Sequence, residues 1–130
     1  MKSVGVALIF DKSSNKVLIG RRAPTEPFAG YWEFPGGKLE QGETPEEAIQ
    51  RELMEELNVE CSVHNKFDET IYTYSTGKFK LLTYFTTIDE STIEKRVHDE
   101  LKWVSIKDAH TYNMFPSNII ILDKLKEHFC

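Results

Sequence analysis

Only two cysteines, Cys61 and Cys130, occur among the 130 residues. A disulfide framework in a short secreted domain normally needs more, so we expect reduced thiols and a cytoplasmic location. Apolar runs long enough to span a membrane are absent as well. The apolar run after Met1 is stopped by Asp11, so it predicts a strand rather than a secretion signal or a membrane anchor.

An excess of positive charge is also missing. The chain has 16 Lys and Arg residues against 21 Asp and Glu residues, a formal net charge of −5. Proteins that coat nucleic acid need clustered basic residues, so we expect no direct binding to DNA or RNA. A small nucleotide remains compatible with this charge, because a bound cation neutralises phosphates locally.

The remaining composition, 40% apolar and 28% charged, is that of an ordinary globular chain of one domain. The segment Ala23–Tyr31, with two prolines and a glycine, is predicted to be a loop. β-rich or alternating runs predict strands at 3–10, 16–22, 67–74, 78–88 and 100–104, the first two as a hairpin. Helices are predicted at 44–57 and from just after Pro116 to about His128. The order indicates a single mixed α/β domain over residues 1–130.

The helix at 44–57 has clear end signals. Thr44 is a good N-cap, Pro45 suits the first helical position, and Glu47 completes a capping box. Asn58 suits the left-handed residue that ends a helix. The residues expected to be buried repeat at i+4: Ile49, Leu53 and Leu57.

This helix also carries more carboxylates than a helix needs. Glu52, Glu55 and Glu56 fall within an arc of about 100°, and like charges so spaced repel by about 0.2–0.5 kcal/mol per pair. Arg51 relieves part of this repulsion if it reaches Glu47 or Glu55. Spacing alone leaves two interpretations open, a solvated acidic face or a site for a hard cation such as Mg²⁺, which prefers oxygen ligands.

Residues 37–59 (GKLEQGETPEEAIQRELMEELNV) decide between them. They resemble the Nudix box: Gly, five residues, Glu, seven residues, Arg-Glu, an aliphatic residue, any residue, Glu-Glu, any residue, Gly, an aliphatic residue. Only Asn58 departs, standing where the family usually has Gly, and Asn tolerates the same left-handed backbone. The resemblance implies an α/β/α sandwich with a mixed β-sheet, and hydrolysis of a nucleoside diphosphate linked to another group.

The resemblance implies roles for the box residues. The expected metal is Mg²⁺, for which Mn²⁺ could substitute, and it acts by polarising phosphoryl oxygens and activating water. Arg51 and Glu43 are expected to orient the loop and helix, and Glu52 to bind metal and orient the attacking water. Together with Glu55 these form the expected catalytic set. The expected metal ligands are Glu52, Glu55 and Glu56, the carbonyl of Gly36 or Gly37, and a loop carboxylate.

The loop carboxylate precedes the last predicted strand. Glu94, Asp99 and Glu100 are all candidates, and Glu100 is preferred because it lies just before Leu101 and Trp103. The Cys/His spacing typical of zinc sites is lacking, so we expect no zinc site. The histidines expected at the surface are His64, His98 and His110.

Outside the box, the chain resembles the MutT branch of the family, which hydrolyses (deoxy)nucleoside triphosphates to monophosphate and pyrophosphate. Its best-known substrate is 8-oxo-dGTP, whose removal sanitises the nucleotide pool and so protects DNA. The motifs that carry this resemblance are Gly20–Ala23, Gly30–Lys38, Trp103-Val104 and Phe115-Pro116-Ser117-Asn118. The substrate-binding residues it implies are Arg22, Glu33, Phe34, Pro35, Gly36, Lys38 and Asn118.

Asn118 has two interpretations. It could cap the last helix, or its amide could accept from N7–H and donate to O6 of 8-oxoguanine. Plain guanine would place a lone pair against the amide oxygen, a mismatch that costs about 1–3 kcal/mol when buried. The family pattern usually has one more residue between Phe-Pro and this Asn, which could shift Asn118 away from the base.

Other functions stay open. One is a pyrophosphohydrolase for CTP, dCTP or modified pyrimidine triphosphates. Hydrolases of that kind share the Trp-Glu-Phe and Gly-Gly-Lys segments. A non-catalytic nucleotide-binding module is less favoured, since such modules lose box carboxylates that this chain keeps. We expect a monomer or a weak homodimer, because no apolar stripe suited to a dimer is evident.

Overall fold

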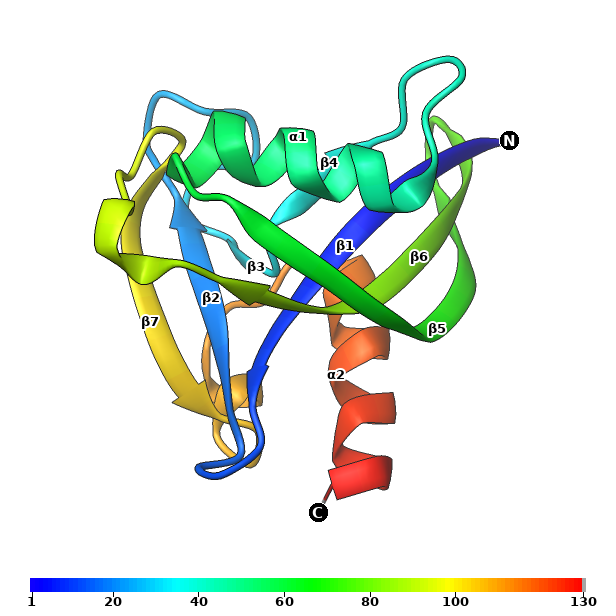
Figure 1. Cartoon of the computed structure of the whole chain (residues 1–130). Coiled ribbons are helices and arrows are strands. Elements are labelled where there is room, and N and C mark those ends of the chain that lie inside the picture. The colour runs from blue at the N-terminus through cyan, green and yellow to red at the C-terminus, as the bar shows by residue number, and fades with distance from the viewer. Residues whose placement is uncertain (130) are drawn as a thin grey trace.

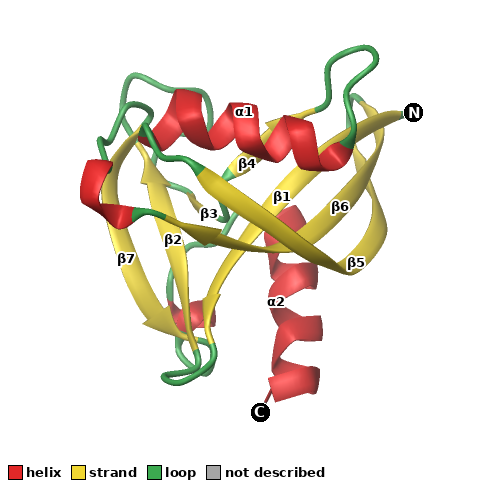
Figure 2. Ribbon diagram, viewed as in Figure 1, coloured by secondary structure: helices red, strands yellow, loops and turns green. Residues whose placement is uncertain are grey.

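Three layers make up the fold, a mixed sheet between two helices (Figures 1 and 2). The computed structural model describes residues 1–129, so Cys130 lies outside the described residues. The helices are α1 (Pro45–Leu57) and α2 (Pro116–Phe129), and two short 3₁₀ turns are η1 (Glu90–Thr92) and η2 (Ala109–Thr111). The strands are β1 (Lys2–Asp11), β2 (Lys16–Arg22), β3 (Trp32–Glu33), β4 (Gly36–Lys38), β5 (Cys61–Tyr74), β6 (Gly77–Ile88) and β7 (His98–Ser105). Neither helix within residues 1–129 is long and apolar enough to cross a membrane.

The sheet has β1 at its centre. Its strand order is β3-β2-β1-β6-β5, with β4 added to β1 and β7 added to β2. β1 and β6 run parallel and the other pairs are antiparallel, so the sheet is mixed. The predicted hairpin of β1 and β2 is present but pairs only beside its turn, at Phe10↔Val17 and Asp11↔Lys16. Beyond the turn the two strands diverge to other partners.

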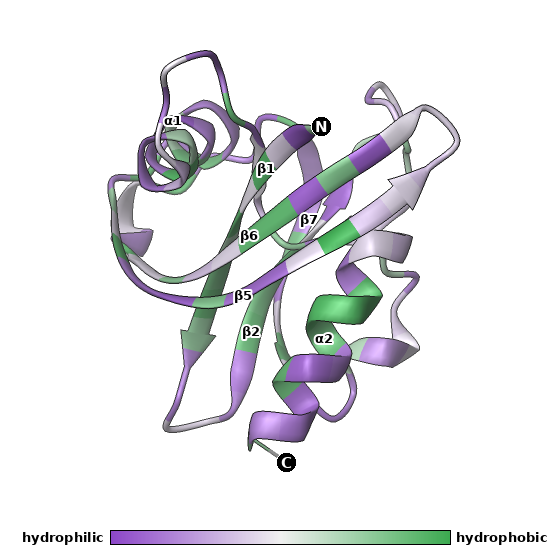
Figure 3. Cartoon of the chain, turned by 90° about the vertical axis from the view of Figure 1, so that its right-hand side faces the viewer, coloured by the Kyte–Doolittle hydropathy of each residue, from purple (hydrophilic) through white to green (hydrophobic). Residues whose placement is uncertain are grey.

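The buried run of β1 serves two cores at once. Val6 and Leu8 pack in a cluster that includes the α2 residues Ile121 and Leu125, whereas Ala7 and Ile9 pack beneath α1. Successive side chains of a strand point to opposite faces, so a strand covered on both sides is apolar throughout. In Figure 3, α2 shows both hydrophobic and hydrophilic turns, as expected for a helix with one buried side. This arrangement confirms the predicted α/β/α sandwich.

Both predicted caps of α1 are present. The Thr44 hydroxyl accepts the Glu47 N–H at 3.1 Å, and the Glu47 carboxylate accepts the Thr44 N–H at 2.9 Å. Asn58 adopts a left-handed backbone with φ of 56°, and its N–H donates to the carbonyl of Met54. The predicted stripe is fully buried. These contacts fix where the carboxylate-bearing helix starts and stops.

The segment before β7 covers the C-terminal end of α1. The Arg96 guanidinium donates to the Met54 carbonyl at 3.1 Å, and the N–H groups of Glu94 and Arg96 donate to the carbonyls of Leu57 and Glu56. The last turn of α1 has no basic residue of its own. Arg96 therefore supplies the positive charge that stabilises a helix C-terminus.

Two strands are longer than predicted. β5 begins at Cys61 rather than Phe67, and β7 begins at His98 rather than Glu100. The first half of β5 is irregular, with register shifts between Val63 and Asp68, and its residues 64–66 are exposed. An exposed edge strand needs no apolar alternation, so its sequence carries little strand signal.

Candidate active site

Glu52 lies directly against β4. A Cβ atom on Gly37 would overlap the Glu52 carboxylate, so only glycine allows this approach. Gly37 itself pairs with Gly5 of β1. The side chain of Glu52 is 18% exposed, which leaves the carboxylate reachable from solvent. The glycine that opens the box and the first of the three carboxylates expected to bind metal therefore form one unit.

Arg51 ties the loop before α1 to the helix. Its Nε and Nη2 donate to the two carboxylate oxygens of Glu43 at 2.7 and 3.0 Å. Its Nη1 donates to Glu52 at 2.9 Å, and Nη2 also reaches the Lys38 carbonyl at 3.0 Å. The pair of Arg51 and Glu43 implied by the resemblance is thus present. Of the two partners on the helix considered for Arg51, Glu55 lies 3.4 Å from Arg51 Nη1, whereas Glu47 is engaged in the capping box.

The charges of this pair are strongly stabilised. Hydrogen bonds from Arg51, followed by one from the backbone N–H of Glu40, lower the pKa of Glu43 to about 2. The pKa of Arg51 is raised above its ordinary value, mainly by the hydrogen bond to Glu43. A bidentate guanidinium–carboxylate pair fixes orientation as well as distance. The pair therefore holds Glu52 in place across the neutral pH range.

Glu56 is a buried carboxyl group without a full set of partners. It is 6% exposed, and its Oε1 has no hydrogen-bond partner among residues 1–129. Burial, a hydrogen bond with Glu52 and the charge of Glu33 raise its pKa well above the usual range. A divalent cation between the carboxyl oxygens of Glu56 and Glu52 would give Glu56 Oε1 a partner and offset the repulsion between the two carboxylates. The residues present therefore fit a metal. Glu55 is more exposed than Glu52 and Glu56, with a side chain 58% exposed.

His98 is buried, which corrects the expectation that it lies at the surface. It is 3% exposed, and ligand atoms of His98, Glu33 and Glu56 lie within 4.8 Å of one another. Its Nε2 is 2.9 Å from Glu33 Oε2. His64 and His110 are exposed, as expected. Nothing local in the sequence marks His98 as buried, because its surroundings come from β2 and β3.

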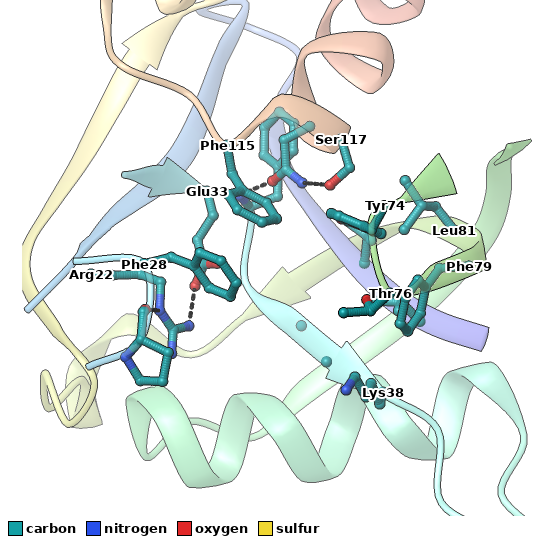
Figure 4. A pocket seen from close by; sticks show the side chains of 17 residues that line it. Arg22, Phe28, Glu33, Lys38, Tyr74, Thr76, Phe79, Leu81, Phe115 and Ser117 are labelled. Atoms are coloured by element: carbon teal, nitrogen blue, oxygen red, sulfur yellow. Dashed lines mark hydrogen bonds and ion pairs between the residues drawn. The ribbon is translucent and has the colours of Figure 1, made fainter. Parts of the chain in front are cut away.

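A cavity of about 320 Å³ opens beside β4 (Figure 4). This volume is within the range of small-molecule sites. Most of the predicted substrate-binding residues line it: Arg22, Glu33, Phe34, Gly36, Lys38 and Asn118. Pro35 does not line it. The Pro35 carbonyl instead accepts the Ala7 N–H at 2.8 Å and holds this segment to β1.

Aromatic side chains form much of the cavity wall, which the sequence did not predict. Phe115 lies 5.0 Å from Phe28 and 6.0 Å from Tyr74 between ring centroids, and its ring is within 25° of parallel to that of Tyr74. Phe79 packs against Tyr74 at 5.1 Å. In Figure 4, Tyr74 and Phe79 face Phe28 across the cavity. These rings come from three separate segments, so only the fold brings them together. A planar heterocycle suits such a wall.

Asn118 lies inside the first turn of α2 and is not its N-cap. The helix begins at Pro116, and the Asn118 amide oxygen accepts the Phe34 backbone N–H at 2.8 Å. Its amide nitrogen donates to the Ser117 hydroxyl at 3.2 Å. An amide nitrogen has two N–H groups, so one donor remains for a ligand. The capping interpretation is therefore wrong.

The preferred loop acid, Glu100, points away from Glu56. Leu101 packs in the cluster beneath α1, so Glu100 one residue earlier faces the other side of β7. There its carboxylate lies 3.5 Å from both Arg21 Nη2 and Lys102 Nζ. Since Glu100 lies on the wrong side of β7, we propose no metal role for it. The other two candidates are also ion-paired, Asp99 with Arg21 and Glu94 with Arg96.

Comparisons with known proteins agree with this geometry. The family described as the NUDIX domain matches residues 1–125. The 8-oxo-dGTP diphosphatase of Escherichia coli strain K12 is 31% identical over 127 residues, which are 97% of this chain and 98% of that protein. The CTP pyrophosphohydrolase of the same organism is 30% identical over 123 residues, covering 95% and 91%.

Solved structures show the same fold. The E. coli ORF135 protein superposes with a TM-score of 0.84 at 30% identity, covering 98% of this chain and 89% of that one. A MutT protein from Methanosarcina mazei Go1 gives a TM-score of 0.83 at 20% identity, covering 98% and 94%. Hydrolases of this family generally use a divalent metal, for which the carboxylates on α1 are suited. The chain therefore belongs to the Nudix family, as a hydrolase of the MutT type.

Proposed function

We propose that this protein hydrolyses (deoxy)nucleoside triphosphates to the monophosphate and pyrophosphate in a Mg²⁺-dependent reaction. The observation that carries the proposal is the partnerless Oε1 of Glu56 beside the carboxyl group of Glu52. Glu52, Glu55 and Glu56, with the carbonyl of Gly36 or Gly37, would hold the metal. When bound, the metal polarises phosphoryl oxygens and favours attack by water.

The protein's own groups orient the reaction. Arg51 donates to Glu52 at 2.9 Å, so one carboxylate oxygen of Glu52 is fixed and the side chain cannot turn freely. Glu43 holds Arg51 in the matching orientation through two hydrogen bonds. We assign Glu52 the role of orienting the attacking water. Arg51 and Glu43 are assigned the role of positioning Glu52. Lys38 and Arg22 line the cavity nearby and suit negatively charged phosphates.

Oxidised purine nucleotides such as 8-oxo-dGTP are the proposed substrates. The aromatic wall accommodates a purine, and the free N–H of Asn118 can donate to a base carbonyl. Its oxygen has a second lone pair besides the one used by Phe34, so it can still accept from N7–H of an oxidised guanine. This reaction would sanitise the nucleotide pool of the cytoplasm. The partner is then a free nucleotide rather than nucleic acid, and the enzyme a monomer or weak homodimer.

Hydrolysis of CTP, dCTP or a modified pyrimidine triphosphate is the alternative. The relative named a CTP pyrophosphohydrolase is 30% identical to this chain, nearly the same as the 31% of the 8-oxo-dGTP diphosphatase. A single donor from Asn118 would equally suit a pyrimidine carbonyl. A comparison of kcat/KM for 8-oxo-dGTP, dGTP, dCTP and CTP separates the two. A preference for dCTP or CTP would replace the purine assignment.

The metal site is tested by pyrophosphate release in the presence of Mg²⁺. Glu52→Gln and Glu55→Gln should each lower turnover by orders of magnitude, while Glu60→Gln, an exposed residue just past α1, should not. Full activity in both box variants would overturn the metal assignment. If the unmodified protein turns over no diphosphate compound, a non-catalytic nucleotide-binding module is the better description.

A further inference from the structure

His98 occupies a space that two features of the fold provide. Arg21 pairs with Glu100 and Arg22 pairs with His98, so Asp99 is an extra residue that makes a bulge in β7. Bulges redirect side chains and are common beside active sites. The His98 side chain is completely buried against Gly20, where an added Cβ would lie 2.7 Å from His98 Cδ2. The ring is therefore held tightly in one place.

One oxygen of Glu33 receives two hydrogen bonds. Glu33 Oε2 lies 2.9 Å from His98 Nε2 and 3.0 Å from Arg22 Nη1. A carboxylate oxygen only accepts, so the tautomer that fits carries its proton on Nε2. His98 Nδ1 has no partner within residues 1–129. The geometry thus gives His98, in β7, the role of a donor that holds Glu33, in β3, across the intervening strand β2.

Arg22 continues this line of contacts to the rim of the cavity. Its Nε donates to the Pro27 carbonyl at 2.7 Å, which fixes the top of the loop between β2 and β3. The next residue, Phe28, has a left-handed backbone with φ of 58° and a ring that packs on Phe115. Figure 4 shows Arg22 and Glu33 joined at one side of the cavity with Phe28 beside them. The contacts therefore run from a buried histidine to an exposed aromatic wall.

We propose that His98 is a positioning residue for nucleotide binding, acting through Glu33 and Arg22 on the loop that carries Phe28. The inference rests on the proposed function in one respect, that the cavity takes the nucleoside triphosphate. A cation held by His98, Glu33 and Glu56 is the competing use of the same groups. Arg22 already places a positive charge on the Glu33 oxygen, which disfavours a second cation there.

The test compares His98→Leu with His98→Gln, because glutamine retains an N–H donor and leucine does not. His98→Leu should raise KM about tenfold with kcat changed less than about twofold, since the lost contact affects binding rather than chemistry. His98→Gln should recover most of the affinity, and His110→Leu, at an exposed histidine, should match the unmodified enzyme. An unchanged KM in His98→Leu, or a fall in kcat alone, would overturn the proposal. A cation site would instead appear as a raised Mg²⁺ or Mn²⁺ requirement in both His98 variants.

Two measurements need no turnover and so separate this proposal from the proposed function. Chymotrypsin should cut after Phe28 faster in His98→Leu than in His98→Gln or the unmodified protein. Nitrogen-15 NMR of the unmodified protein should show a slowly exchanging proton on His98 Nε2, which remains testable even if the leucine variant does not fold. A proton on Nδ1 instead, or equal cleavage in all variants, would refute the positioning role.

Discussion

The amide oxygen of Asn118 accepts a hydrogen bond from the backbone N–H of Phe34 at 2.8 Å. This bond joins the first turn of α2 to the short link between β3 and β4, and both partners line the cavity. Asn118 therefore serves the fold with its oxygen and faces a ligand with the free N–H of its nitrogen. The two roles can be separated by substitution.

Asn118→Ala should destabilise the protein by about 1–3 kcal/mol, because the buried Phe34 N–H loses its acceptor. Asn118→Asp keeps an oxygen for that N–H, so it should remain closer to the unmodified stability while losing the amide donor. Urea unfolding measures the first effect, and kcat/KM for 8-oxo-dGTP and for dGTP, which both carry the O6 acceptor, measures the second. Equal stability of the alanine variant would show that the Phe34 bond contributes nothing. An unchanged kcat/KM for both nucleotides in the aspartate variant would remove the Asn118 amide donor from base recognition.

Glu56→Gln should make the metal-free protein more stable by about 1–3 kcal/mol near neutral pH, since it removes a buried group that is costly to ionise. The pKa of Glu56 is raised in the folded state, mainly by burial, above the ordinary 4.5. The folded state therefore binds this proton more tightly than the unfolded state, and the cost declines as pH falls toward 4.5. Turnover should be lost. Thermal unfolding without metal at several pH values gives the comparison, and a less stable Gln variant would contradict it.

The ion pair of Glu43 with Arg51 should resist acid. Because hydrogen bonds lower the pKa of Glu43 from 4.5 to about 2, its stabilising contribution is complete above about pH 4.5 and is lost as pH falls toward about 2. The difference in unfolding free energy between the unmodified protein and Glu43→Gln should be constant near neutrality and shrink only in that acidic interval. Glu60→Gln, without such a pair, is the matched control. A difference that already changes between pH 6 and 7 would rule out this assignment.

Gly37→Ala should damage the metal site more than the fold. The added methyl group would occupy the position of the Glu52 carboxylate, so Glu52 must move away from β4. We expect a large fall in turnover and weaker Mg²⁺ activation, with a smaller loss of stability. Gly42→Ala is an informative contrast, because its added Cβ meets no atom within 4 Å and only its positive φ of 83°, which Gly37 does not share, disfavours alanine. Normal Mg²⁺ activation in Gly37→Ala would refute the coupling of Gly37 to Glu52.

Features set by neighbouring residues were predictable from the sequence. The capping box, Pro45 and the left-handed Asn58 are all local signals, and each lies where the pattern indicated. The box residues are likewise close together in the chain, and the bond between Arg51 and Glu43 spans one loop and two helical turns. The continuous apolar run of β1 correctly indicated a strand. It did not indicate that alternate residues of this strand pack in two different cores.

Features that depend on distant segments were not predictable. His98 is buried because Gly20 leaves room for its ring and Glu33 provides an acceptor, and neither is near it in sequence. The aromatic wall combines the 23–31 loop, the hairpin of β5 and β6, and the residue before α2. Glu100 was preferred for its position in the chain, but the face of a strand residue depends on register and on the bulge at Asp99.

The central position of β1 bears on how the chain acquires its fold. β1 precedes the other strands in the chain, yet its parallel partner is β6, whose register with it runs from Phe79 to Thr86. During synthesis β1, the most apolar strand, therefore stays without its parallel partner until β6 has been made. Contacts between such distant segments slow folding and leave a strand edge available for aggregation. Growth temperature and chaperone supply should therefore affect the yield of soluble enzyme.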